Sequence, residues 1–251
     1  MKVLVIGEFC VDEFVYGSVL RMCPEAPVPV FNPVKTIKNP GMAGNVVANI
    51  KSIEPSADVT FFYQKGTIKK TRIVDEKSNQ MIVRIDDGEL KENRDVIELN
   101  PIHIAAIKNC DLVIVSDYDK GYLTDAALME IAEHAKLSIL DSKRKLSESI
   151  INKFSFVKLN KEEGTLNGKL SELPNVIVTL GKHGAKINGT TYTQDKPMET
   201  IDVSGAGDTF VAAFGLSYLK SKDIELSIKY ANELAGIVVG KRGVAVPFER
   251  N

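Results

Sequence analysis

The sequence predicts an α/β protein with a doubly wound, mostly parallel sheet, helices on both faces of that sheet and a small β flap. Two patterns carry this prediction. From Asp111 onward, short β-branched runs alternate with helical stretches, which is typical of βαβ units. Earlier, residues 23–33 (CPEAPVPVFNP) hold four prolines. Proline cannot lie in a central strand, so this segment predicts an edge strand or an extended flap.

Length and composition fit a single soluble enzyme-sized domain. The 251 residues suffice for one large α/β domain with an appendage, and we expect one domain over 1–251 with the flap contributed by about 13–38 and 67–86. The formal net charge is −1, which gives no field for nucleic acid or a membrane surface. Three cysteines without metal spacing and no apolar signal segment predict a cytoplasmic protein.

The first third of the chain predicts one buried strand, one helix and a group of flap strands. Val3–Ile6 reads as a buried strand that ends at Gly7. A helix begins near Ala43 and directs apolar residues inward at helical spacing. Further strands are expected at 59–63, 67–74 and 81–85, the last two pairing around 75–79.

The remaining elements follow from the strand and helix alternation. Thr124 is a candidate cap for a helix that runs through Lys136. Strands are expected at 111–117, 138–142, 156–160 and 176–181. These strands end in the polar residues Asp117, Asp141, Asn160 and Thr179. Parallel sheets build their sites at the carboxyl ends of strands, so a site is predicted there.

The stretch DVSGAGDTF, residues 202–210, combines a tight turn with a helix start. Phe210, Phe214 and Tyr218 recur at a spacing of four, which predicts a helix that begins near Gly207. The backbone N–H groups of Gly205, Ala206 and Gly207 would then form an anion site at the helix N-terminus. Asp208, in the first turn, is placed to take a proton from an alcohol. The alternative is that Asp208 only stabilises the helix start and the glycines only form the turn.

This stretch also resembles the C-terminal signature of the ribokinase-like (PfkB) carbohydrate kinases. Three further segments resemble motifs of that family in the same order along the chain: PGMAGNVVANI (40–50), KLNKEEG (158–164) and VTLGKHGA (178–185). No GxxxxGK[ST] loop occurs. The resemblance implies a ribokinase-like fold, ATP-dependent phosphoryl transfer to a sugar with Mg²⁺, Asp208 as the catalytic base, and Gly205, Ala206 and Gly207 as the anion hole.

Other segments resemble one branch of that family more closely. They are GEFCVDEFVYG (7–17), CPEAPVPV (23–30), SDYDKGYL (116–123) and ANELAGIVVGKRGVA (231–245). This branch phosphorylates D-glycero-D-manno-heptose 7-phosphate at the anomeric hydroxyl, giving the 1,7-bisphosphate used in ADP-heptose synthesis. Two other hypotheses stay open: a kinase for another sugar or sugar phosphate, and a catalytically weak sugar or nucleotide sensor.

The resemblance assigns the sugar side of the site. Asp12, Gly41 and Asn45 would contact the sugar, although Asn45 also suits a helix cap. A substrate that already carries a phosphate calls for cationic side chains, for which the branch implies Lys70, Arg72 and Arg84. Lys120 and Lys143 are similar candidates, and surface solubility is the alternative for each of these basic residues.

The resemblance also assigns the nucleotide side. Asn160 and Glu163 match the motif that organises Mg²⁺ and its waters, with Glu163 as the metal ligand; an exposed acidic loop is the alternative. The nucleotide would lie against Thr179, Gly181, Gly184 and Asn232. The family places a monovalent cation such as K⁺ near the catalytic loop, where a turn-stabilising carboxylate explains Asp202 equally well.

Two departures from the family pattern and one assembly are predicted. Met42 replaces the second glycine of the N-terminal signature. The helix that family members carry after the strand ending near Tyr63 is missing, because VTFFYQKGTIKKTRIV (59–74) joins two strands almost directly. An apolar edge strand in the flap would stay exposed in a monomer, so we expect a homodimer through PEAPVPV.

Overall fold

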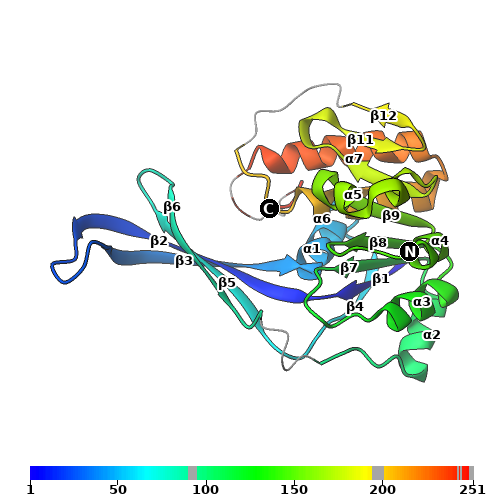
Figure 1. Cartoon of the computed structure of the whole chain (residues 1–251), viewed down its shortest axis with the longest axis horizontal. Coiled ribbons are helices and arrows are strands. Elements are labelled where there is room, and N and C mark those ends of the chain that lie inside the picture. Colours follow the sequence, from blue (N-terminus) through cyan, green and yellow to red (C-terminus); the bar gives the residue numbers. More distant parts are fainter. Residues whose placement is uncertain (90–94, 194–200, 242, 244, 249–251) are drawn as a thin grey trace.

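Two β-sheets organise the computed structural model of the chain, which describes residues 1–89, 95–193, 201–241, 243 and 245–248 (Figure 1). The larger sheet has the strand order β12-β11-β10-β9-β8-β7-β1-β4. Its strands are β1 (Lys2–Gly7), β4 (Asp58–Phe62), β7 (Leu112–Asp117), β8 (Ser138–Ser142), β9 (Phe156–Asn160), β10 (Val176–Thr179), β11 (Ala185–Ile187) and β12 (Thr190–Tyr192). The strands from β4 to β10 are parallel, and β11 and β12 are antiparallel. The predicted mostly parallel α/β sheet is confirmed.

Helices cover both faces of this sheet, as a doubly wound fold requires. One apolar core joins the sheet to α1 (Ala43–Ile53), α6 (Ala206–Ser221) and α7 (Ile224–Val239). The core on the opposite face includes side chains of α2 (Pro101–Asn109), α3 (Asp125–His134) and α4 (Glu148–Lys153). The short α5 (Lys161–Asn167) and the 3-10 helices η2 (Gly168–Glu172) and η3 (Gly181–His183) follow β9 and β10.

Helix starts follow local capping chemistry. Thr124 caps α3 by accepting the N–H of Ala127, as predicted, and the helix ends at His134, two residues before the predicted Lys136. Asn100 caps α2, and Asp223 caps α7. Among the described residues, no helix combines the length and apolar character that a membrane span requires.

The predicted apolar face of α6 forms an aromatic stack in the core. The rings of Phe210 and Phe214 are stacked, and so are those of Phe214 and Tyr218. Phe156 of β9 packs edge-on against Phe214, with ring centroids 5.0 Å apart. This packing fixes the axis of α6 against the sheet and therefore fixes where its N-terminus lies.

The second sheet has the order β3-β2-β5-β6. Its strands are β2 (Phe9–Met22), β3 (Pro29–Met42), β5 (Ile68–Asp75) and β6 (Met81–Asp87). The predicted flap segments 13–38 and 67–86 overlap these strands and include the turns at 23–28 and 76–80. Figure 1 shows the β2–β3 hairpin reaching far out from the α/β body. The prolines at 29 and 33 lie on β3, an edge strand, as the pattern predicted.

The two faces of the second sheet carry different side chains. Directly paired residues of neighbouring strands project to the same face. Asp12 pairs with Lys70 and Arg72 with Arg84, so the polar face carries most of the predicted sugar-site residues. The opposite face carries an apolar patch of Val15, Ile73, Val83 and Ile85. Beside this patch, the same face carries Glu13 with its ion-pair partners Lys38 and Lys69.

The connection from β4 of the large sheet to β5 of the second sheet is short. β4 ends at Phe62 and β5 begins at Ile68, with no helix between them. The predicted loss of the family helix is therefore confirmed. In its place an aromatic cluster lines the β4 edge, in which Phe61 and Tyr63 stack with centroids 4.6 Å apart and Phe9 packs against both.

Candidate active site

The carboxyl ends of the parallel strands meet the N-terminus of α6. Gly205 is the N-cap of α6 with φ 80°, a left-handed conformation that favours glycine. No side chain caps this helix end. The Ala206 N–H donates to Val203 O at 3.3 Å, so an anion would have to displace this turn bond to reach the Ala206 amide. The helix begins at Ala206, within one residue of the predicted position.

Asp208 lies in the first turn of α6 and is only 5% exposed. Its Oδ2 accepts a hydrogen bond from Asn45 Nδ2 and its Oδ1 one from Tyr118 Oη, both at 2.8 Å. Burial raises the pKa of Asp208 to about 6, and the nearby Asp141 adds to the rise against the opposing hydrogen bonds. A carboxyl group with this pKa is an effective general base near neutral pH. An Asp that only stabilises a helix start needs neither burial nor hydrogen bonds from distant segments, and Asp208 has both.

Asn45 contacts the candidate base directly. It is the third residue of α1, whose N-cap is Met42, so the alternative of Asn45 as a helix cap is wrong. Its Oδ1 accepts a hydrogen bond from Asn49 Nδ2 at 3.1 Å, which orients its amide toward Asp208. Asn49 Oδ1 in turn accepts a hydrogen bond from the Thr209 hydroxyl at 2.8 Å. The sequence analysis missed Asn49 and Thr209, because nothing in their local pattern links α1 to α6.

Tyr118 was also missed by the sequence analysis. It lies in the loop after β7, and its backbone N–H donates to Glu8 Oε2 at 2.8 Å. The other Glu8 oxygen accepts the backbone N–H groups of Lys120 and Tyr122. Burial, together with the Asp117 carboxylate, raises the pKa of Glu8. Glu8 therefore holds the loop that presents the Tyr118 hydroxyl to Asp208.

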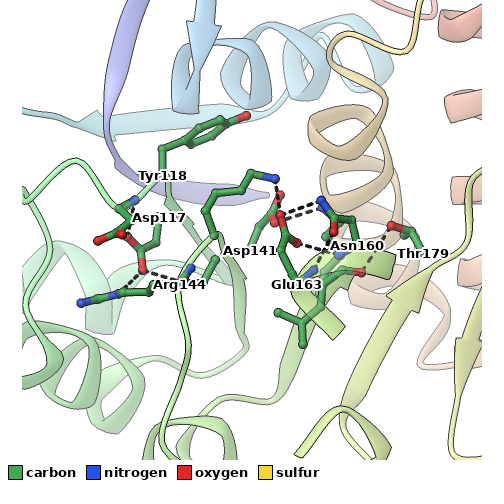
Figure 2. Close-up of polar contacts among 12 residues, drawn as sticks. Asp117, Tyr118, Asp141, Arg144, Asn160, Glu163 and Thr179 are labelled. Atoms are coloured by element: carbon green, nitrogen blue, oxygen red, sulfur yellow. Dashed lines mark hydrogen bonds and ion pairs between the residues drawn. The ribbon is translucent and has the colours of Figure 1, made fainter. Parts of the chain in front are cut away.

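Polar side chains follow one another along the carboxyl ends of β7, β8, β9 and β10. Figure 2 shows Arg144 against Asp117, then Asp141, then the pair of Asn160 and Glu163 with Thr179 beside it. Arg144 Nε donates to Asp117 Oδ2 at 2.7 Å. The strand-end residues picked from the sequence are thus brought to one edge, as predicted.

Two ion pairs occupy this edge near Asp208. Lys158 Nζ lies 3.0 Å from Asp141 Oδ1, and both side chains are 2% exposed. Lys143 Nζ lies 2.7 Å from Glu163 Oε1 and is one-third exposed. Burial by itself would lower the pKa of Lys143, but Asp141 and Glu163 raise it overall. Lys143 therefore remains cationic at neutral pH.

Asn160 and Glu163 form a capping box at the start of α5. Asn160 Oδ1 accepts the N–H of Glu163, and Glu163 Oε2 accepts the N–H of Asn160. Glu163 is buried, so the alternative of an exposed acidic loop is wrong for this residue. Both of its oxygens already accept hydrogen bonds, which fits a Mg²⁺ held through water better than a direct ligand. Among the residues that the structure describes, no group of three or more His, Cys, Asp or Glu side chains is placed to hold a metal ion.

Two adjoining cavities lie at the N-terminus of α6. The first, about 160 Å³, contains all four residues predicted for the nucleotide: Thr179, Gly181, Gly184 and Asn232. The second, about 560 Å³, is lined by Asp208, Asn160 and the two lysines described above. The cavities share Thr179, Gly181, Val203, Ala206 and Gly207. A nucleotide with its base in the first cavity could therefore extend its phosphates into the second.

The residues predicted for the sugar side are linked by ion pairs. Arg72 binds the buried Asp12, and the Asp12 carboxylate fills the space where a side chain at Gly41 would lie. Glu89 bridges Lys70 and Lys120, with O···N distances of 3.0 and 2.7 Å. Arg84, in contrast, is half-exposed and bonds Asp86 of its own strand. The structure therefore links Lys70 to Lys120 and Arg72 to Asp12, but not Arg84 to either pair.

Met42 adopts a backbone conformation that glycine prefers. Its φ of 53° and ψ of −132° lie outside the regions that L-residues favour. Its side chain is buried with Cys10 and Ile68, and Tyr118 packs against this cluster. The position where the family signature has glycine therefore keeps its glycine-like backbone while carrying a thioether.

The family comparison decides the identity of the domain. Residues 57–251 match the model of the pfkB family carbohydrate kinases. The chain belongs to this family. It is a carbohydrate kinase by family, and the predicted fold and enzyme class are confirmed.

Relatives of this carbohydrate kinase support the assignment. The chain is 32% identical to a bifunctional protein HldE of Campylobacter jejuni and 30% identical to one of Nitratiruptor, with 99% and 97% of the chain aligned. It spans only 63% and 62% of those two proteins. The segment 231–245 that resembles the heptose branch includes Arg242 and Val244, which lie outside the described residues.

Solved structures share the fold of the kinase. Arabidopsis thaliana ribokinase complexed with ribose and ATP superimposes with a TM-score of 0.72 at 16% identity, covering 96% of this chain and 93% of that one. Escherichia coli phosphofructokinase-2 in complex with potassium gives a TM-score of 0.70 at 15% identity, covering 97% of this chain and 94% of that one.

In the present chain, Asp202 accepts hydrogen bonds from the backbone N–H groups of Ser204 and Gly243 at 2.9 and 3.1 Å. That geometry matches the turn-stabilising interpretation of Asp202.

Proposed function

We propose that this kinase transfers the γ-phosphoryl group of ATP to the anomeric hydroxyl of D-glycero-D-manno-heptose 7-phosphate, giving the 1,7-bisphosphate. The observation that carries the proposal is the buried carboxylate of Asp208 at an uncapped, glycine-lined helix start that opens on two joined cavities. The heptose acceptor is supported by the resemblance of 7–17, 23–30 and 116–123 to the heptose branch and by the relatives named HldE.

Asp208 would act as the general base. Its carboxylate takes the proton of the acceptor hydroxyl, the resulting oxygen attacks the γ-phosphorus, and the bond to the β-phosphate oxygen breaks so that ADP leaves. The N–H groups of Gly205 and Gly207, with that of Ala206 once it leaves Val203 O, would stabilise the charge that develops on the phosphoryl oxygens. Mg²⁺, held through its waters by Glu163 and Asn160, supplies charge neutralisation for the phosphates when bound. A monovalent cation such as K⁺ near the loop also stays a proposal.

The polar face of the second sheet would receive the acceptor. Asp12, beside Gly41, can accept two sugar hydroxyl protons and so orient the ring. Lys70 and Lys120 converge on the Glu89 carboxylate, and a phosphate dianion offers the same pair of lysines a stronger partner. Arg72 and Arg84 lie on the same face and complete the predicted cationic surface.

A kinase for another sugar or sugar phosphate is the second candidate. Met42 favours it, because the thioether fills space beside Cys10 and Tyr118 where the family signature has glycine. The third hypothesis, a catalytically weak sensor, is disfavoured because a sensor needs no buried base, and Asp208 is both buried and shifted in pKa. The cytoplasm, where ATP is plentiful, stays the proposed location.

The test is ADP formation from ATP and Mg²⁺ with a panel of free and phosphorylated sugars, by wild type and by Asp208→Asn. We expect turnover with the heptose 7-phosphate and a loss of about 100- to 10,000-fold in kcat for the variant, since the base is removed. Turnover only with another sugar would support the second candidate. Binding of sugar or nucleotide with no turnover of any panel member would support the sensor.

The pH dependence of the same reaction tests the role of Asp208. Because the base must be ionised and its pKa is raised to about 6, kcat should be level above that pH and fall tenfold per pH unit below it. A profile with no acid limb near pH 6 contradicts Asp208 as the base. Binding of nucleotide measured across the same pH range is the control for acid unfolding.

A further inference from the structure

Lys158 is a fully buried lysine that the proposed mechanism does not use. It lies near the carboxyl end of β9 and is 2% exposed, and lysine is among the residues least often buried. Its ammonium group has three N–H donors, and among the described residues it donates one hydrogen bond, to Asp141 Oδ1. The ammonium thus keeps donor capacity in a buried site.

The position of the ammonium relative to α6 is the second observation. A Cβ built on Gly207 would lie 2.9 Å from Lys158 Nζ, and Gly207 is in the first turn of α6. The ammonium therefore lies against the positive end of the helix dipole. A cation there is disfavoured by the dipole, whereas an anion is stabilised by the dipole and by the ammonium together. The arrangement favours a bound anion over the empty site.

The surroundings specify which anion fits. Lys158 lines the same cavity as Asp208 and the amide groups of Gly205, Ala206 and Gly207. That cavity joins the one that contains the residues predicted to bind the nucleotide. Lys143 reaches the same cavity, but its ammonium is one-third exposed and pairs with Glu163 at α5. Of these two lysines, Lys158 is the one packed against the helix start.

We propose that Lys158 is a catalytic residue whose ammonium binds the phosphoryl group as it passes from ATP to the acceptor. The inference rests on the proposed phosphoryl transfer but not on the identity of the sugar. As the acceptor oxygen forms its bond to the γ-phosphorus and the bond to ADP breaks, the non-bridging oxygens keep their negative charge beside Lys158. Lys158 gives up no proton in this step; Asp208 receives the proton of the acceptor hydroxyl. Gly207 is required as glycine because a larger residue would displace the ammonium.

The competing role is structural: Lys158 could only neutralise Asp141. Lys158→Met would leave that carboxylate buried without its partner, so by itself it does not separate the roles. Asp141→Asn/Lys158→Met removes both charges together and keeps the volume of the lysine stem. At pH 8, where Asp208 is ionised, we expect this double variant to fold and to lose about 100-fold in kcat, similar to the loss of one oxyanion donor. A purely structural role predicts turnover close to that of wild type.

Gly207→Ala supplies a second, independent measurement. Among the described residues outside the first turns of α6, Lys158 Nζ is the atom nearest to the added methyl group, at 2.9 Å, so the variant should fold while the ammonium is displaced. If the loss of kcat acts through Lys158, adding Gly207→Ala to Asp141→Asn/Lys158→Met should lower kcat by less than threefold further. If the kcat losses of Gly207→Ala and of Asp141→Asn/Lys158→Met multiply in full, the methyl group acts on the phosphate itself. That result would overturn the inference that Gly207 is needed to make room for the Lys158 ammonium.

Nucleotide binding separates failure of this inference from failure of the proposed function. Thermal shift with a non-hydrolysable ATP analogue should exceed that with adenosine in wild type, and the difference should shrink in the double variant. Wild-type turnover together with an unimpaired double variant overturns the role of Lys158 alone. An inactive wild type that also fails to distinguish the ATP analogue from adenosine overturns both.

Discussion

At the residue scale, the raised pKa of Asp208 that suits a general base also affects the stability of the protein. Its pKa is raised from 3.8 to about 6 in the folded protein, chiefly by burial. A raised pKa means that the folded state binds the proton more tightly than the unfolded state, so this residue makes the protein less stable as the pH rises from 3.8 through 6. The ionised side chain therefore lowers the free energy of unfolding above pH 6, where it is needed as a base.

This sign predicts that an inactive variant is the more stable one. Asp208→Asn removes this titration. The free energy of unfolding of the variant minus that of wild type should therefore be larger at pH 8 than at low pH, by up to about 3 kcal/mol. Urea unfolding of wild type and Asp208→Asn at pH 8 and pH 5 measures this, and the advantage of the variant should fall to about half at pH 5. A pH-independent difference contradicts the raised pKa. Asp111→Asn, at a half-buried carboxylate with a lowered pKa, is the control with the opposite sign.

At Met42, the unfavourable backbone conformation lowers the stability of the protein, whereas the packing of the buried side chain raises it. A non-glycine residue in a sparsely populated φ/ψ region costs about 1–3 kcal/mol. Met42→Ala keeps that cost and also loses the packing with Cys10 and Ile68, whereas Met42→Gly loses the packing but relieves the strain. We therefore expect Met42→Gly to unfold at a higher urea concentration than Met42→Ala. At an ordinary buried site glycine is the less stable of the two by about 0.5–1 kcal/mol, and that order here would refute the strain.

At the scale of elements, the packing of α6 against the large sheet determines where the proposed catalytic loop, residues 202–208, lies. A Cβ at Gly215 would lie 2.9 Å from Leu112 Cδ2 and 3.0 Å from Ile139 Cδ1, so glycine lets the helix approach β7 and β8 closely. Gly215→Val should lower the free energy of unfolding by about 1–3 kcal/mol through overpacking. Chemical denaturation gives the value.

Leu112→Ala tests whether that cost comes from the contact with β7. The double variant Gly215→Val/Leu112→Ala should be more stable than the two single effects predict, by about 0.5–3 kcal/mol, because the valine occupies the space that the leucine leaves. Strict additivity would mean that the valine strains the helix itself rather than the contact.

At the scale of the whole molecule, the second sheet exposes an apolar patch on the face opposite Asp12. Val83 and Ile85 are 47% and 52% exposed, and the register places Val15 and Ile73 on the same face. We predict a homodimer in solution that covers this sheet, including the predicted PEAPVPV edge. Light scattering of wild type should give twice the mass of the chain, and Val83→Lys/Ile85→Lys should give the mass of one chain. Leu166→Lys, at a 51% exposed leucine on α5, is the matched control and should stay dimeric. A monomeric wild type contradicts the prediction.

The sequence by itself determined the features that short-range rules specify. Strand and helix alternation predicted the parallel sheet, and Thr124 predicted the start of α3. The spacing of Phe210, Phe214 and Tyr218 predicted the start of α6 to within one residue. Each depends on residues within a few positions of one another, through capping, side-chain periodicity or glycine backbone freedom. The candidate loop 202–208 and Asp208 as the proposed base could therefore be named before any contact was known.

The tertiary structure alone decided what surrounds that base. Asn45 and Tyr118 lie 163 and 90 positions from Asp208, and Lys158 reaches the helix start from β9. No local pattern specifies these pairs, because they arise when packing of α1, β7 and β9 brings distant segments to one edge. The raised pKa of Asp208 has the same origin, since burial is a property of the folded chain.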